Sequence, residues 1–429
     1  MPTYVVDQAT GNDANSGSDA SPWATFHRGL AVPVAGDTVL VRNGTYNAGT
    51  GFFSPTNAGV SGAPIAFRRY PGHTPVLTRT LVDTTLGYDA VLSVNRDWTI
   101  FDGFQIATPF RVDAWNDNIT IENMALDIGE LPCLTGNRSG IGLNGVDNAT
   151  IRNNRVKGPR FATTGGPCNP GNAAGIYFIN SHFLTITNNE VSDTGNAIKC
   201  KRVGHNVAIA NNYVHDIAPM GFGIDMTYAA DASCSGDGCR TSDFSIHHNI
   251  VVGASIAISM FNDGTNLMRD ISIYNNTLYN AQKGWVGSNG GPGFKFYNNI
   301  VHATDLPGTD AHVQFFGVPP IDLLEDYNCY RGFTDAKLRS VAGEFTLANW
   351  RATYNLDLAS TLSDPLFVGP LTNVNGFKLQ TGSPAIGAGR VGGIPSGATC
   401  NMGAYETGNE VIGLLNAPAA PMNLQMSFV

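Results

Sequence analysis

Lysine is rare in this chain, yet two of its seven lysines, Lys199 and Lys201, lie two residues apart. Arg202 and His205 follow closely, which makes a cationic spot on a protein of net charge −9. In a strand both lysine side chains point to the same face. Cationic neighbours lower the pKa of a lysine, so that it can act as a base. Positive charge nearby stabilises the enolate formed when a proton leaves the carbon next to a carboxylate. The pattern predicts β-elimination on an acidic, uronate-containing polysaccharide.

Further side chains near these lysines fit roles in the same reaction. Tyr177 precedes Lys199 by one repeat, and its hydroxyl could protonate the leaving glycosidic oxygen; a sugar-stacking ring is the alternative. Arg202, or Arg160 from a long insertion, is expected to neutralise the substrate carboxylate. Substrate-binding side chains are expected among the remaining polar and aromatic candidates, which are Arg160, His205, His215, Tyr228, Phe261 and Trp285.

Asp225 supports two alternative interpretations. With Asp193, Asp231 or Asp263 it could form the carboxylate pair of a glycoside hydrolase, which requires a separation of about 5 Å or of about 6.5–9.5 Å. It could instead form an exposed cross-strand ion pair with Lys199, worth at most about 1 kcal/mol. A third hypothesis is a carbohydrate-binding surface protein or phage-derived protein without catalysis.

A short repeat must position these residues. Alternating apolar and polar residues lead into Asn or Asn-Asn and then a branched apolar residue, as in Thr150-Ile-Arg-Asn-Asn154 and Ile186-Thr-Asn-Asn189. From Gly103 to Asn299 the anchors are spaced by 20, 31, 35, 23, 37, 27 and 23 residues. Period-2 alternation indicates short strands, and such a period predicts a solenoid of stacked parallel coils. Asn tolerates the left-handed conformation, and stacked amides can bond from coil to coil.

Stacked coils place equivalent outward side chains in columns about 4.8 Å apart. We align the strands after each Asn by inward apolar pairs: Ile141/Leu143, Ile176/Phe178, Ile198/Cys200, Ile224/Met226, and either Ile256/Ile258 or Ile258/Met260. One outward column is then Gly142, Tyr177, Lys199, Asp225 and Ser259. The next is Asn144, Ile179, Lys201, Thr227 and Phe261.

Composition excludes several classes of protein. Charged residues make up 14% and apolar residues 42%, so the chain can build a core and is neither disordered nor a coiled coil. It has no basic surplus, so we expect no nucleic acid partner. No apolar run reaches membrane-spanning length, so no membrane partner is expected.

The seven cysteines and the acidic loops raise the question of metals and disulfides. Cys234 and Cys239 bracket a short loop typical of a small disulfide, and Cys133 and Cys168 lie in loops that could be neighbours. The C-x2-C spacing of zinc sites is absent. Calcium is the one cofactor considered, on the Asp-rich loops Asp7–Asp19 or Asp231–Asp237, with plain turns as the alternative.

The chain resembles secreted right-handed parallel β-helix proteins of the polysaccharide-lyase type. The resemblance rests on the opening Gly11-Asn-Asp-Ala-Asn-Ser-Gly17 and Ser21-Pro-Trp-Ala-Thr25, and on the closing Ser383-Pro-Ala-Ile386-Gly-Ala-Gly389. Asn196-Ala-Ile-Lys-Cys-Lys-Arg202 is similar to the lysine-bearing strand of chondroitinase-B-like and alginate-lyase-like enzymes, which implies Lys201 as the base. Where those enzymes carry an arginine strand, this chain has Asp225, and their calcium-binding glutamates have no clear counterpart.

These observations give one expected organisation. The fold class is all-β, a right-handed parallel β-helix with caps. We expect an N-terminal cap and first coils over 1–90, central coils over 91–330 with insertions at 127–140, 157–175 and 217–240, C-terminal coils and cap over 331–408, and a tail over 409–429. No signal peptide is recognisable, and the expected protein is an extracellular monomer.

Overall fold

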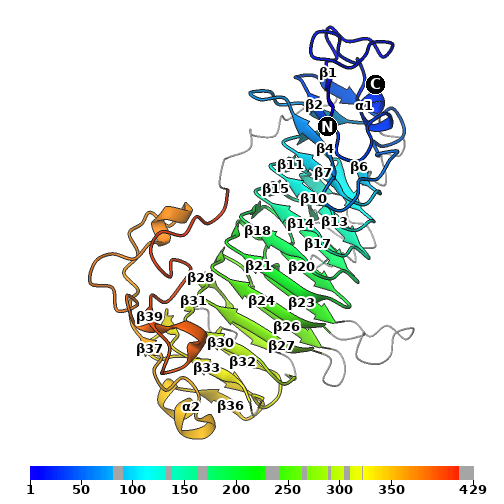
Figure 1. Ribbon diagram of the computed structural model, residues 1–429. Coiled ribbons are helices and arrows are strands. Elements are labelled where there is room, and N and C mark those ends of the chain that lie inside the picture. The colour runs from blue at the N-terminus through cyan, green and yellow to red at the C-terminus, as the bar shows by residue number, and fades with distance from the viewer. Residues whose placement is uncertain are drawn as a thin grey trace.

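The chain folds into an elongated stack of coils, each made of short strands joined by corners (Figure 1). The computed structural model describes residues 1–80, 90–131, 138–161, 172–228, 241–262, 268–287, 291–303, 310–320 and 322–414. The predicted insertions 127–140, 157–175 and 217–240 and the tail each lie partly outside these residues. Among the described residues the three long sheets are parallel, except for the last strand pair of sheet 3. The predicted parallel β-helix is therefore confirmed.

Three sheets run the length of the stack. Sheet 1 comprises β1 (Thr3–Val6), β2 (Thr38–Val41), β4 (Ile65–Arg69), β7 (Thr99–Asp102), β10 (Thr120–Glu122), β14 (Thr150–Arg152), β18 (Thr185–Thr187), β21 (His205–Ala210), β24 (Thr241–His247), β27 (Met268–Tyr274), β30 (Lys295–Tyr297) and β33 (Leu324–Asp326). Sheet 2 comprises β3 (Thr45–Asn47), β5 (Val76–Thr78), β8 (Gln105–Ile106), β11 (Ala125–Asp127), β15 (Arg155–Lys157), β19 (Glu190–Ser192), β22 (Tyr213–His215), β25 (Ile250–Val252), β28 (Thr277–Ala281), β31 (Ile300–Ala303), β34 (Cys329–Arg331) and β37 (Thr361–Leu362). Sheet 3 comprises β6 (Ala90–Val94), β9 (Arg111–Ala114), β13 (Arg138–Asn144), β17 (Ala173–Ile179), β20 (Asn196–Lys201), β23 (Phe222–Tyr228), β26 (Ile256–Asn262), β29 (Lys283–Gly287), β32 (Ala311–Phe315), β35 (Leu338–Ser340) and β36 (Gly343–Phe345).

The Asn-Asn corner joins sheet 1 to sheet 2, and its two residues do different work. The first Asn adopts the left-handed conformation, for example Asn211 with φ 56°. The second is fully buried and bonds through its amide to the next coil over distances of 3.0 to 3.2 Å. This ladder comprises Asn154, Asn189, Asn212, Asn249, Asn276, Asn299 and Asn328. The predicted left-handed conformation is confirmed at the first Asn of the corner, and the predicted hydrogen bonding from coil to coil is confirmed at the second.

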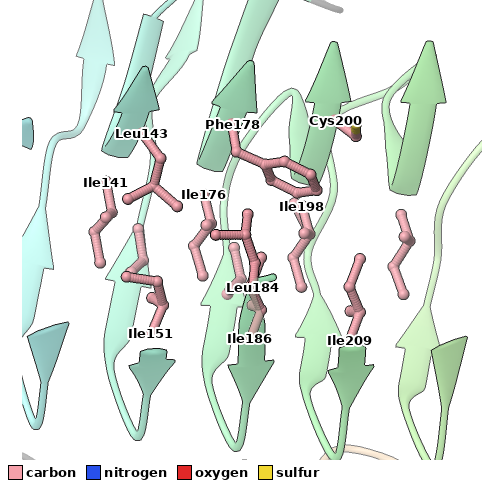
Figure 2. Packing of buried hydrophobic residues seen from close by; sticks show 14 of the residues in the cluster. Ile141, Leu143, Ile151, Ile176, Phe178, Leu184, Ile186, Ile198, Cys200 and Ile209 are labelled. Carbon is pink, nitrogen blue, oxygen red and sulfur yellow. The ribbon is translucent and has the colours of Figure 1, made fainter. Parts of the chain in front are cut away.

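The core fills the inside of the coils with aligned apolar side chains. Figure 2 shows Ile141, Ile176 and Ile198 stacked on one wall, facing Ile151, Ile186 and Ile209 on the other. The predicted inward pairs are confirmed by the strand register. For β26 the sequence left two possible pairs. Ile224 pairs with Ile258 and Met226 with Met260, so Ile258/Met260 is the inward pair.

Both ends of the stack are closed by non-repeating structure. At the N-terminal end α1 (Phe26–Ala31) packs with Trp23 and Phe53 on the first coils. At the C-terminal end α2 (Leu347–Tyr354) places Trp350 over the last coils. The short elements β12 (Glu130–Leu131), β16 (Arg160–Phe161), η3 (Val374–Phe377), β38 (Gly389–Arg390), η4 (Val391–Gly393) and β39 (Thr399–Cys400) complete the described secondary structure.

The C-terminal strap, residues 390–413, runs back along the stack beside sheet 2, where Figure 1 draws it in red. It is held by the left-handed corner residues. Asn298 donates to the Arg390 carbonyl (2.8 Å), Asn275 to the Asn401 carbonyl (3.0 Å) and Asn188 to the Val411 carbonyl (2.7 Å). The corner column therefore anchors the strap across several coils.

Candidate functional site

The lysine-bearing columns lie on the outward face of sheet 3, as the sequence predicts. Tyr177 pairs with Lys199, Lys199 with Asp225, and Asp225 with Ser259. In the adjoining column Lys201 pairs with Ile179 on one side and Thr227 on the other, and Thr227 with Phe261. The two lysines lie on one strand, β20, about 7 Å apart along the backbone.

Lys199 and Asp225 form a buried ion pair. The Lys199 Nζ atom lies 3.0 Å from Asp225 Oδ2, and the two side chains are 9% and 0% exposed. Thr227 Oγ1 donates to the same carboxylate (3.0 Å), and Asn196 Nδ2 lies 3.3 Å from it. The predicted partners are confirmed, but the prediction that the pair is exposed is wrong. This network fixes the Lys199 ammonium, and the Asp225 carboxylate balances its charge.

The buried pair also corrects the expected role of Asp225. A hydrolase would need its carboxylate to face a substrate and a second carboxylate. Within the described residues Asp225 instead faces a lysine, a threonine and an asparagine, with no exposed surface. Asp193 is bonded to Arg160, and Asp231 and Asp263 lie outside the described residues.

Lys201 is the more accessible of the two lysines. Its side chain is half-buried, and burial, followed by the nearby Lys199 and Arg202 charges, lowers its pKa. Arg202 follows at the end of β20 with φ 66°, a left-handed conformation that is uncommon for arginine. Strained backbone of this kind often occurs at functional sites. A half-buried amine with a lowered pKa is suited to accept a proton.

Tyr177 is largely buried, with 6% of its surface exposed. The alternative in which its ring is an open stacking platform is therefore wrong, because a sugar needs an exposed ring face. Its backbone position pairs with that of Lys199 in the column. The role of this hydroxyl as an acid stays a prediction.

Aromatic side chains flank the lysines on the same sheet. Phe261 lies 5.9 Å from both Phe222 and Phe316, measured between ring centroids, and Phe316 is 49% exposed. Phe261 thus belongs to an aromatic patch suited to sugar stacking. Phe222 and Phe316 were not predicted from the sequence. Phe222 begins β23 and Phe316 follows β32 directly, so aromatic residues at the ends of the strands of sheet 3 are the sequence signal that could have indicated them.

Trp285 corrects the predicted set of sugar-binding residues. It pairs with the inward Ile258, is fully buried, and stacks on Phe296 at 4.7 Å. Its indole nitrogen donates to Met260 Sδ (3.1 Å). Trp285 is a core residue, so it cannot contact a substrate. For Tyr228 the side chain lies outside the described residues.

The two histidines lie on sheets other than that of the lysines. His205 lies on β21 of sheet 1, where it stacks on His182 at 4.8 Å and contacts Ser242 Oγ at 2.9 Å. His215 lies on β22 of sheet 2, between Glu190 and Asp216. Burial opposes protonation of His215, but these carboxylates outweigh it and raise its pKa. Both histidines lie on sheets other than that of Lys201, and their role in substrate binding stays a prediction.

Arg160 lies on β16, just outside the three main sheets. Its guanidinium is 2.7 Å from Asp193 and 3.3 Å from Glu130. Both interactions would have to loosen before Arg160 could meet a substrate carboxylate. Arg202 follows Lys201 directly in the chain.

The cysteines and acidic loops give no built metal site in the part of the chain that is described. Cys200, Cys329 and Cys400 are free, whereas Cys133, Cys168, Cys234, Cys239 and the Asp231–Asp237 loop lie outside it. In the Asp7–Asp19 loop, Asp7 binds Thr10 and Arg42, and Asp13 binds Thr25. No cluster of three or more metal-ligating side chains occurs among the described residues. Calcium thus stays a prediction.

No described helix is long and apolar enough to span a membrane.

Comparison with known proteins agrees with this architecture. A family model described as right handed beta helix region matches residues 116–312. No curated protein gives a significant match. Similar solved structures include pectate lyase Pel9A (15% identity, 95% of this chain and 96% of that chain, TM-score 0.47). Others are a mannuronic acid specific polysaccharide family 6 lyase from human gut microbiota (13%, 79% and 77%, 0.48) and the GH136 lacto-N-biosidase from Eubacterium ramulus (14%, 79% and 61%, 0.44).

Proposed function

We propose that the chain is an extracellular polysaccharide lyase that cleaves a uronate-containing polysaccharide at the outward face of sheet 3. The observation that carries the proposal is Lys201, a half-buried amine with a lowered pKa beside a fixed ammonium and an arginine. Such an amine is neutral more often than an ordinary lysine, so it can accept a proton at moderate pH.

The reaction needs a base, a cation for the enolate and a proton donor. Lys201 Nζ takes the proton from the carbon next to the substrate carboxylate. The electron pair forms a double bond as the β carbon–oxygen bond breaks, and Tyr177 donates its proton to the departing oxygen. Arg202 stabilises the negative charge that develops on the carboxylate. Phe261 and Phe316 stack against neighbouring sugars.

The test is a search for the unsaturated product. Alginate, pectate, ulvan and glycosaminoglycans are incubated with the protein, and the ultraviolet absorbance of the conjugated product is followed. Lys201→Met should lower kcat by roughly 10²–10⁴-fold. The matched control is Lys295→Met, because Lys295 is an exposed lysine on sheet 1.

Each outcome discriminates between the hypotheses. Absence of unsaturated product on every uronate polymer contradicts elimination. New reducing ends without absorbance indicate a hydrolase, and carbohydrate affinity without turnover indicates a binding protein. The pH profile adds a further check, since the rate should rise with pH as Lys201 loses its proton, at a pH below the ordinary lysine range.

A further inference from the structure

A pocket lies on a different face of the stack, between sheet 2 and the segment that precedes the strap. It has a volume of about 360 Å³, within the size range of small-ligand sites. Its floor is an outward column of sheet 2, in which Tyr279 pairs with His302 and His302 with Arg331. Its opposite wall comes from residues 364–380, with Asp364 and Gln380 among the lining residues. The two walls are far apart in sequence and adjacent in the fold.

The floor of this pocket is a pair of stacked rings. The Tyr279 and His302 rings lie 4.6 Å apart at an interplanar angle of 25°. Phe377 supports Tyr279 edge-on at 5.4 Å and belongs to a buried cluster with Tyr405. The rings are therefore fixed before a ligand arrives, which lowers the entropic cost of binding.

The polar groups of the pocket offer donors and acceptors without net charge. Arg331 Nη2 lies 3.0 Å from Asp364 Oδ2, and both side chains are about half exposed. Burial, followed by the Arg331 charge, lowers the pKa of His302, which keeps its ring neutral. The buried His302 Nδ1 has no hydrogen-bond partner among the described residues. Because the charges balance, the pocket is better suited to hydroxyl groups than to an anion.

We propose that this pocket, floored by Tyr279 and His302 and walled by Arg331 and Asp364, is a binding site for a neutral pyranose unit of a glycan. Because the two rings face each other, they present their edges to the pocket, and the apolar face of the sugar packs across those edges. Adjacent hydroxyls bond to the guanidinium and the carboxylate, which present a donor and an acceptor side by side. The site lies on sheet 2, whereas Lys201 lies on sheet 3, so its occupancy does not depend on catalysis at Lys201.

The test uses saturation-transfer difference NMR with neutral hexasaccharides, namely cello-, xylo-, manno- and galactohexaose. At least one should receive saturation from the protein. Tyr279→Ala should weaken its binding at least tenfold. Arg331→Ala should do the same and is the safer variant, because Arg331 is on the surface, whereas Tyr279 also packs on Phe377. The control Phe52→Ala removes an exposed aromatic side chain elsewhere on the surface.

The outcomes separate this site from the proposed catalytic face. Binding that survives Lys201→Met but is lost in Arg331→Ala supports the pocket, even where no polymer is cleaved. The proposal is overturned if no hexasaccharide receives saturation, if binding persists in both pocket variants, or if only sheet 3 variants abolish it.

Discussion

Removal of the Asp225 carboxylate is predicted to be among the most damaging changes on sheet 3. Asp225→Ala leaves the Lys199 ammonium without its partner at a position where the side chain is 9% exposed. Removing one member of a buried ion pair costs about 3–5 kcal/mol. Replacing both residues, as in Lys199→Met with Asp225→Leu, removes the charge as well as the partner, so the expected cost falls close to zero.

Urea denaturation followed by circular dichroism measures these differences in the free energy of unfolding. The two single variants and the double variant form a thermodynamic cycle in which strong coupling is expected. If Asp225→Ala costs less than about 1 kcal/mol, the pair behaves as an exposed one and the reasoning is refuted. The double variant should fold but lose lyase activity; full activity would show that the pair has no part in the site.

Two further predictions concern the stack itself. Asn212→Ala removes an amide that makes four hydrogen bonds, so it should lower the free energy of unfolding, measured in urea, by about 3 kcal/mol. Asn211→Gly should lower it little, because glycine adopts the φ of 56° found there without strain. Glu325 and Asp357 are buried together at the end of the ladder, and burial raises both pKa values, that of Asp357 to about 6. The folded state therefore holds protons that the unfolded chain releases near pH ~4. The free energy of unfolding should fall as the pH rises from about 4 through 6, and it should fall less in Glu325→Gln. If the difference between the unchanged protein and Glu325→Gln in urea does not vary with pH, this prediction is contradicted.

The repeat made the architecture predictable from the sequence. The coils from β10 to β33 share the same corner, so Asn recurs at each turn from sheet 1 to sheet 2 over this part of the stack. The inward apolar pairs then fixed the register, and with it the neighbours of Lys199 and Lys201. These properties depend on local spacing and on the preceding coil, which a single sequence contains.

Burial and distant contacts were not predictable in the same way. Trp285 lies in a five-residue strand, too short for alternation to decide which side faces inward. The burial of Lys199 and the position of the strap depend on segments far away in sequence. His205 and His215 follow Lys201 closely along the chain, but each corner between them turns the chain onto another sheet.

The buried pair on sheet 3 is itself evidence about what the site requires. Two coils beyond Asp225 the same column contains Val286, which is fully buried, so an apolar side chain fits that environment. Apolar replacements of buried ion pairs are often as stable or more stable. Stability alone therefore gives no reason for a lysine and an aspartate in this column. A fixed ammonium next to Lys201 does give one, because after burial its charge is the next largest cause that lowers the pKa of that lysine, and it outweighs the opposing charge of Asp225.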